Sequence, residues 1–393
     1  MRKLIAILIV AVCTSIAAVA QISVAPMAIK ERTLANGLRV VSLQENASPT
    51  VAIHVWYNVG SKDDPQGRSG FAHMFEHMMF KSTKNMPNEK MDRITEDVGG
   101  FNNASTWDDF TNYYEVVPSN YLETLLWAES DRMVNLNVDE TNFNSERDVV
   151  KEEFRQRILA NPYGMLYGDF DQKQLDAWTD KYFNRIAKPA GTIPRVSVTE
   201  PERTKEQRHL TTAPNVPFPA VAITYLAPTS KSPDIPALRV AETILSGGES
   251  SRLYQSLVYR QQISQQAQFS ADIRADRGLL TFVAIASEGK TPDVLEKALL
   301  AELKLIQDQP VTAKELEKAK NQLITQAIQA REDNDGKAIA IEFAIAYQGD
   351  PKAVNSDIKK LQAVTAADVQ RVMKKYFSDS NRVVIYYAQE AEK

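Results

Sequence analysis

The sequence predicts an α+β fold made of two similar domains, and three observations support this prediction. First, 393 residues are more than one typical domain contains. Second, VAITYLAP, beginning at Val221, resembles VAIHVWY, beginning at Val51, and each is followed by a polar loop and a helical segment. Third, residues 189–219 are rich in proline and polar residues, which favours a linker. We therefore expect an N-terminal domain over residues 21–205 and a C-terminal domain over residues 206–393.

The first 20 residues have a different character. Arg2 and Lys3 precede an apolar run over residues 4–12, and small residues lead to Ala20. This layout predicts a secretory signal peptide over residues 1–20, and the alternative is a membrane anchor, for which the stretch is short. We expect export to the periplasm, with no membrane span after signal cleavage. Cys13 is the only cysteine, so the mature chain would lack disulfides.

The composition excludes some functional classes. With 44% hydrophobic and 24% charged residues, the chain is typical of globular proteins. The net charge of -4 gives no electrostatic reason to expect a nucleic acid or an anionic membrane as a partner.

In the first half, the residue pattern predicts strands at residues 37–43, 51–57 and 113–117. A helix is expected across residues 70–82, followed by a second that Ser119 could cap and a third that runs from Ser145 beyond Arg157. Residues 99–111 are rich in Asn, Ser, Thr and Asp.

In the second half, a helix containing ALRVAETIL follows the repeated strand but carries no histidine. Thr312 with Glu315, and Thr365 with Asp368, predict capping boxes that open two further helices. RVVIYY, near the C-terminus, predicts a last strand.

The strongest chemical signal is GFAHMFEHMMF, which places His73, Glu76 and His77 within five positions. On a helix, residues four apart share a face, so both imidazoles can reach one ion, with Glu76 close by. Two imidazoles suit zinc, whose catalytic sites take three protein ligands and leave one position open. The flanking Phe71 and Phe75 predict a buried helix, in which these polar groups would be costly without a metal. We therefore expect one zinc ion per chain, with Glu76 as the general base.

A third zinc ligand is expected in SERDVVKEEFRQR, which offers Glu146, Asp148, Glu152 and Glu153. Glu146 and Glu153 fall on one helical stripe that also contains valine, whereas Glu152 lies about 100° away from Glu153. A stripe with two carboxylates and apolar residues is unusual for a solvent-exposed face. The alternative, a solvated acidic helix, remains open at this point.

Together these segments resemble the M16 metallopeptidases, the group of pitrilysin and the mitochondrial processing peptidase, in which the zinc motif is H-x-x-E-H. The resemblance covers most of the chain after residue 20. It includes GSKDDPQGRSGFAHMFEHMMFKST, GGFNNASTWDDFTNYYEVVP, ERDVVKEEF, GGESSRLYQSL and VTAADVQRVMKKYF. It implies two similar domains, each an antiparallel sheet covered by helices.

The resemblance also implies roles for individual residues. His73, His77 and Glu153 would bind Zn²⁺, Glu76 would be the general base, and Glu146 would orient a histidine ligand.

Asn103 and Ala104 would lie beside a bound peptide that pairs as an extra strand. Without the resemblance, a turn residue is a nearly equal interpretation of Asn103.

The chain departs from the family pattern in two places. Active members carry an Arg and, seven residues on, a Tyr that hold the scissile carbonyl, whereas Val258 and Gln265 occupy these positions here. A zinc-free M16 subunit that supplies the Arg and Tyr donors is therefore an expected partner. In addition, NPYG and GDFD nearly adjoin, so the first domain looks shortened after Glu153.

The predicted function is a zinc-dependent endopeptidase that hydrolyses short or unfolded peptides, acting as the zinc-bearing subunit of a two-subunit peptidase. The alternative is a non-catalytic structural or peptide-binding core subunit with the same fold. The four residues of the predicted metal set favour the peptidase, because a scaffold has no physical need for them.

Overall fold

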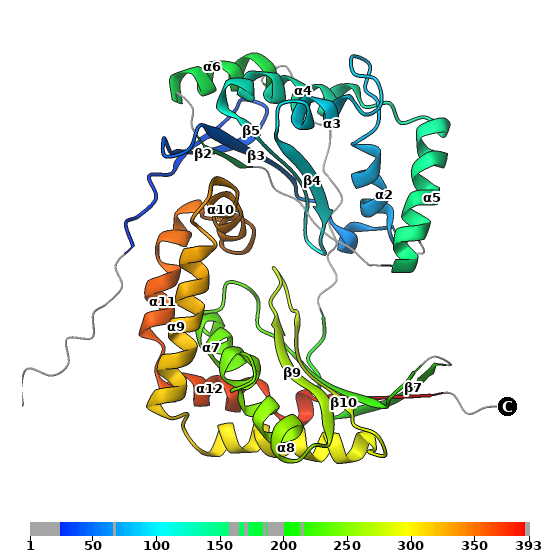
Figure 1. The fold of residues 1–393 in the computed structure, drawn as a ribbon, viewed down its shortest axis with the longest axis vertical. Coiled ribbons are helices and arrows are strands. Elements are labelled where there is room, and N and C mark those ends of the chain that lie inside the picture. Colours follow the sequence, from blue (N-terminus) through cyan, green and yellow to red (C-terminus); the bar gives the residue numbers. More distant parts are fainter. Residues whose placement is uncertain are drawn as a thin grey trace, which may run out of the picture.

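The computed structural model of this chain describes residues 24–65, 68–156, 165–168, 172–183, 186, 200–213 and 216–389. The predicted signal peptide, and residues 189–199 and 214–215 of the predicted linker, lie outside the described residues. Figure 1 shows two units, each built on its own β-sheet with helices packed against it. This arrangement confirms the predicted fold class.

The strands form two sheets. In the first, six strands lie in the order β1 (Lys30–Thr33), β2 (Arg39–Gln44), β6 (Met165–Gly168), β3 (Thr50–Tyr57), β5 (Thr111–Pro118) and β4 (Phe101–Thr106). In the second, five strands lie in the order β7 (Gln207–Ala213), β11 (Val383–Gln389), β8 (Ala220–Leu226), β10 (Leu279–Ala286) and β9 (Ser264–Asp272).

The two sheets share one topology, which explains the repeat in the sequence. Strand β3 pairs antiparallel with β5 and β6, and β8 pairs antiparallel with β10 and β11 in the same way. The resemblance implied antiparallel sheets, whereas each sheet contains one parallel pair, β2 with β6 and β7 with β11. Strands β4 and β9 each lie at a sheet edge. Because β6 fills the position that β11 fills in the second half, the short segment after Glu153 still completes the first sheet.

Helices cover both faces of the first sheet. Side chains alternate along β3, so Val51 and Ile53 join the core beneath α4 (Leu122–Asn135) and α6 (Gln172–Phe183), while Ala52 joins the core on the opposite face. That opposite face packs against α10 (Asn334–Gln348), which comes from the second half of the sequence. The remaining helices of the first half are η1 (Ser61–Asp63), α2 (Phe71–Met78), α3 (Lys90–Glu96), η2 (Ser119–Tyr121) and α5 (Glu140–Gln156).

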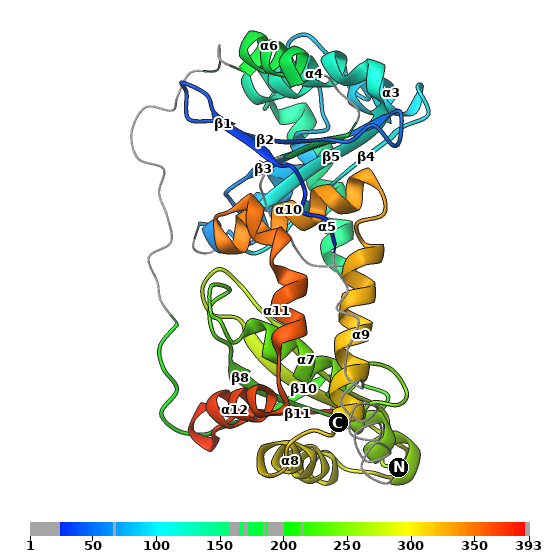
Figure 2. The ribbon, with the colours of Figure 1, turned by 90° about the vertical axis from the view of Figure 1, so that its left-hand side faces the viewer.

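The second sheet has its own large apolar core. The remaining helices of the second half of the sequence are α7 (Ile235–Ser246), η3 (Tyr254–Arg260), α8 (Pro292–Asp308), α9 (Ala313–Gln329), η4 (Pro351–Asn355), α11 (Asp357–Ala363), α12 (Ala366–Tyr376) and η5 (Asp379–Asn381). Figure 2 shows that α9 leads up from this unit to α10 beneath the first sheet and that α11 leads back. The second sequence segment therefore contributes to both structural units.

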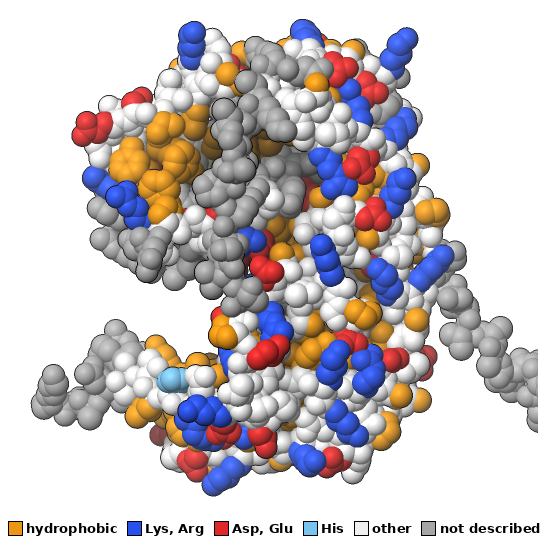
Figure 3. Space-filling model, turned by 180° about the vertical axis from the view of Figure 1, so that it is seen from behind, with side chains coloured by type: hydrophobic (Ala, Val, Ile, Leu, Met, Phe, Trp, Pro, Cys, Tyr) orange, Lys and Arg blue, Asp and Glu red, His pale blue; other side chains and the backbone are white. Residues whose placement is uncertain are grey.

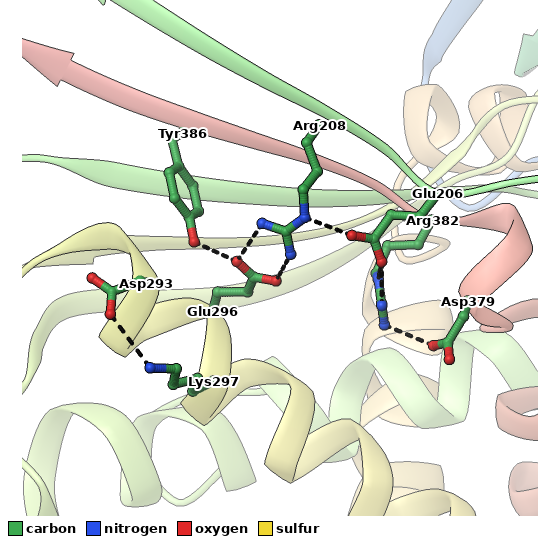
Figure 4. A network of polar contacts seen from close by, with 8 residues as sticks. All are labelled: Glu206, Arg208, Asp293, Glu296, Lys297, Asp379, Arg382 and Tyr386. Carbon is green, nitrogen blue, oxygen red and sulfur yellow. Dashed lines mark hydrogen bonds and ion pairs between the residues drawn. The ribbon is translucent and has the colours of Figure 1, made fainter.

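The predicted linker contains a strand that the sequence analysis did not anticipate. Residues 207–213 form β7, which pairs along its length with β11. Arg208 on β7 donates to Glu296 on α8 over 3.1 Å, and the same carboxylate accepts from Tyr386 on β11 (Figure 4). Next to them, Arg382 Nε donates to Glu206 over 2.7 Å. These partners lie far away in the sequence, so the local proline content could not reveal the strand.

Several element boundaries also differ from the prediction. Ser119 lies in the turn η2, and α4 begins at Leu122 without a side-chain cap. The helix expected from Ser145 begins at Glu140 as α5. Both capping boxes are confirmed, with Thr312 and Thr365 each accepting from the N–H three residues later.

The halves meet at α10 and at the tips of two hairpins. Arg274 Nη1, in the β9–β10 turn, lies 3.0 Å from Asp108 Oδ2 in the β4–β5 turn, and the Ala275 N–H donates to Asp109 Oδ2 over 3.0 Å. Beyond these contacts the molecule is hollowed between the two halves, as Figure 3 shows from behind. None of the described helices combines the length and the apolar character that crossing a bilayer requires.

Candidate metal centre

Helix α2 carries the H-x-x-E-H motif, and a carboxylate fixes its first turn. Gly70, which precedes the helix, has a left-handed φ of 93°, a value that suits glycine. Asp64 accepts hydrogen bonds from the Gly70 N–H over 2.7 Å and from the Ala72 N–H over 2.8 Å. Asp64 therefore satisfies main-chain donors at a helix end that has no side-chain cap of its own.

The two histidines converge on one point. His73 Nε2 and His77 Nε2 lie 3.3 Å apart, and the ring centroids are separated by 4.8 Å. Two nitrogens bound tetrahedrally to zinc at about 2.0–2.1 Å would lie about 3.4 Å apart. The spacing of the nitrogens and the chemistry of these donors thus both fit zinc.

A buried carboxylate lies on the far side of His77. Glu146 Oε2, from α5, is 3.2 Å from His77 Nδ1, and Lys81 Nζ is 2.6 Å from Glu146 Oε1. If the Nδ1 proton is assigned to this bond, His77 presents its Nε2 lone pair toward His73. Glu146 therefore has the placement that the predicted orienting role requires.

Glu76 lies beside the histidines and is almost buried. Ligand atoms of His73, Glu76 and His77 all lie within 4.8 Å of one another. One carboxylate oxygen of Glu76, Oε2, accepts a hydrogen bond from the Thr106 hydroxyl at the end of β4. No sequence pattern marks Thr106, because its contact with Glu76 depends on how β4 packs beside α2.

Glu153, the predicted third ligand, lies on α5, but its side chain is outside the described residues. Helix α5 packs beside α2, as Figure 1 shows. Glu146 and Glu153 are seven residues apart, about two helical turns, so both positions belong to one face of α5. Glu153 as a zinc ligand remains a prediction.

Asn103 and Ala104 lie on the edge strand β4. Among the described residues, the Ala104 N–H bonds to the side chain of Asn103, over 2.8 Å, and not to the main chain of a further strand. This edge of the first sheet can therefore accept an additional strand.

The corresponding edge in the second half is covered. Ser246 and Glu242, on α7, accept from the N–H groups of Phe269 and Ala271 on β9. Arg239, also on α7, donates to the Ala271 carbonyl over 3.0 Å. Helix α7 takes the place of α2 in this half and carries no histidine. The two edges therefore differ in the metal ligands beside them and in whether a further strand can reach their main chain.

The structure describes both positions at which Arg and Tyr donors were expected from the resemblance. Val258 lies in η3, and the Gln265 side chain donates to the Ala286 carbonyl of its own sheet over 2.8 Å. Tyr259 is 68% exposed, and Arg260 is exposed as well.

One sequence prediction about α2 was wrong. Phe71 and Phe75, taken as signs of a buried helix, are 36% and 43% exposed. The buried positions of α2 are Ala72, Met74, Glu76 and Met78. The apolar spacing could not show that the two phenylalanines face away from the core, toward a pocket lined by Val59 and Pro65.

Comparison with known proteins shows the family of the chain. Residues 39–165 match the family Insulinase (Peptidase family M16), and residues 159–323 match the Peptidase M16 inactive domain. The chain is 27% identical to the zinc protease PqqE of Helicobacter pylori, over 90% of this chain and 91% of that protein.

Two solved structures share the fold. A protease from Helicobacter pylori is 25% identical, with a TM-score of 0.86, over 92% of this chain and 99% of that chain. The first half of the periplasmic protease PqqL from Escherichia coli is 17% identical, with a TM-score of 0.73, over 93% of each chain. At this identity the second likeness shows the fold alone.

Proposed function

Because the chain belongs to the M16 family of peptidases, we propose that it is a zinc-dependent endopeptidase that hydrolyses short or unfolded peptides. The observation that carries the proposal is the 3.3 Å approach of the His73 and His77 Nε2 atoms, with the Glu76 carboxylate beside them. A scaffold has no physical need to bring these three groups together.

His73, His77 and Glu153 would hold the ion, and Glu146 would fix the ring of His77. Bound zinc would polarise the peptide carbonyl and acidify water. Lys81 lies 2.6 Å from the second oxygen of Glu146, and its charge balances a carboxylate that is buried in the protein.

Glu76 is the general base in this proposal. Its carboxylate takes a proton from the attacking water and returns it to the leaving amine, so the peptide bond is replaced by a carboxylate and an amine. Glu76 is only 9% exposed, so little bulk water competes with the attacking water for its carboxylate.

The peptide would bind as an extra strand on β4, beside Asn103 and Ala104. Two features favour this edge over its counterpart in the second half. It adjoins the helix that carries the histidines, and within the part of the chain that the structure describes no helix side chain bonds to its main chain, whereas α7 side chains bond to the main chain of β9. Because strand pairing uses the main chain of the peptide, an unfolded segment would bind with little sequence selection.

Val258 and Gln265 cannot supply the guanidinium and phenol that hold the scissile carbonyl in the family. We therefore expect a zinc-free M16 subunit to complete the site, and a chain purified alone to be nearly inactive. Residues 1–20, as a signal peptide, would place the complex in the periplasm.

The test is metal analysis and peptide cleavage on the complex purified from its native source, compared with the Glu76→Gln variant and with the lone chain. The peptidase predicts one zinc per copy of this chain in the wild-type and the Glu76→Gln complexes, and cleavage of a peptide mixture only by the wild-type complex. A complex that holds no zinc, or that cleaves equally well without Glu76, would instead favour the non-catalytic core subunit. Strong activity of the lone chain as a monomer or homodimer would exclude the two-subunit arrangement.

A further inference from the structure

Thr106 is hydrogen-bonded to Glu76, and the proposed mechanism gives this bond no role so far. Its hydroxyl donates to Glu76 Oε2, and the residue is 2% exposed. A buried hydroxyl bonded to a carboxylate adds a charge-assisted interaction that fixes the side-chain rotamer.

Glu76 has two chemical options in this site. Its carboxylate belongs to the same cluster as the histidine nitrogens, so it could coordinate a cation as well as act as a base. A carboxylate that coordinates the ion is a poorer proton acceptor, because the cation draws its charge. A hydroxyl that holds one oxygen of Glu76 restricts its approach to the ion.

Thr106 is held firmly in place itself. It pairs with Thr111 in the β4–β5 hairpin, and the next residue, Trp107, donates its N–H to the Phe110 carbonyl over 2.9 Å. The tip of this hairpin is bound to the second half through Asp108 and Asp109. The position of Thr106 therefore depends on both halves of the molecule.

We propose that Thr106 is a positioning residue that links the peptide-binding strand β4 to the alignment of Glu76. It lies two residues after Ala104, so a peptide that pairs with β4 would order the strand that carries the Glu76 partner. The kinetic part of this proposal rests on the proposed peptidase function. The contact with Glu76 does not, and it can be measured without activity.

The kinetic experiment compares Thr106→Val, which removes the hydroxyl at nearly constant volume, with Thr106→Ser, which keeps it. In the complete complex, Thr106→Val should lower kcat about 10- to 100-fold with little change in KM, because other residues hold the peptide. Thr106→Ser should recover most of kcat. Equal losses in both variants, or wild-type kcat in Thr106→Val, would overturn the proposal.

The second experiment uses the metal-free chain. Thr106→Val should lower the melting temperature by a few degrees in the wild-type background and leave it nearly unchanged in a Glu76→Met background, where the acceptor is absent. An equal shift in both backgrounds would show that Thr106 does not hold Glu76. If the wild-type complex cleaves no peptide, the proposed function fails, and this melting experiment still decides the role of Thr106.

Discussion

His54 on β3 and Glu342 on α10 form a buried ion pair that joins the first sheet to the second half of the sequence. His54 Nδ1 lies 2.7 Å from Glu342 Oε1, and its Nε2 lies 2.9 Å from Asp335 Oδ1. Both ring nitrogens thus face carboxylates, and the side chains of His54 and Glu342 are fully buried. A charged imidazole is the form that satisfies both partners.

This pair predicts a loss of stability at alkaline pH. Burial alone would lower the pKa of His54, but Glu342 and Asp335 outweigh it and raise the pKa from 6.5 to about 9. Below pH 6.5 the folded and unfolded chains both hold the proton, so the stabilisation is fully present. As the pH rises through about 9, this stabilisation is lost. The free energy of unfolding should then have fallen by on the order of 3 kcal/mol in total. Urea unfolding of the wild type between pH 6 and 9.5 measures this decline.

The matched control replaces the pair by neutral groups of similar shape, His54→Asn with Glu342→Gln. Burial raises the pKa of Glu342 to about 7, so this residue also favours the folded state at lower pH, and both groups must be changed together. The double variant should show a much flatter profile between pH 7 and 9.5. Parallel profiles would mean that His54 does not carry the effect.

The hairpin contact between the halves predicts that substituting Asp109 will lower the free energy of unfolding more than substituting Asp108. Asp109 is nearly buried and accepts from the Ala275 N–H over 3.0 Å, with Lys62 Nζ at 2.5 Å. Asp109→Ala leaves these donors unpaired and should lower the free energy of unfolding by about 2 kcal/mol. Asp108 is more exposed, so Asp108→Ala should cost less than about 1 kcal/mol. Equal costs for the two substitutions in a denaturant titration would contradict this account of the contact.

Substituting Glu146 should weaken zinc binding more than it lowers the stability of the fold. Glu146→Ala removes the acceptor at His77 Nδ1, so the ring loses its fixed orientation, and the dissociation constant for zinc should rise about 10- to 100-fold. Glu140→Ala, an exposed position at the start of the same helix, should leave it unchanged. Competition with a chelator measures both constants. An unchanged affinity in Glu146→Ala would remove Glu146 from the site.

The sequence predicted the parts of this protein that depend on local spacing. His73 and His77 share a helix face because residues four apart always do, and the capping boxes at Thr312 and Thr365 need no tertiary context. The repeat around Val51 and Val221 was visible because the two equivalent strands occupy the same place in their sheets and bury the same kind of residues.

Features that depend on distant partners could not be predicted. Strand β7 is specified by its pairing with β11, which begins 176 residues later in the sequence. Arg132 is buried beside Glu115 and Glu129, and its contact with Glu115 depends on how α4 packs on β5. Thr106 reaches Glu76 only because β4 packs beside α2.

The most direct test of the central claim is a crystal structure of the zinc-loaded chain, with the metal located by its anomalous scattering. We predict one zinc ion at about 2.0–2.1 Å from His73 Nε2 and His77 Nε2 and at about 2.0–2.2 Å from a carboxylate oxygen of Glu153. Glu76 should remain outside bonding distance, with its hydrogen bond to Thr106 intact. A zinc ion bound elsewhere, or a Glu153 carboxylate far from both imidazoles, would contradict the assignment of this site.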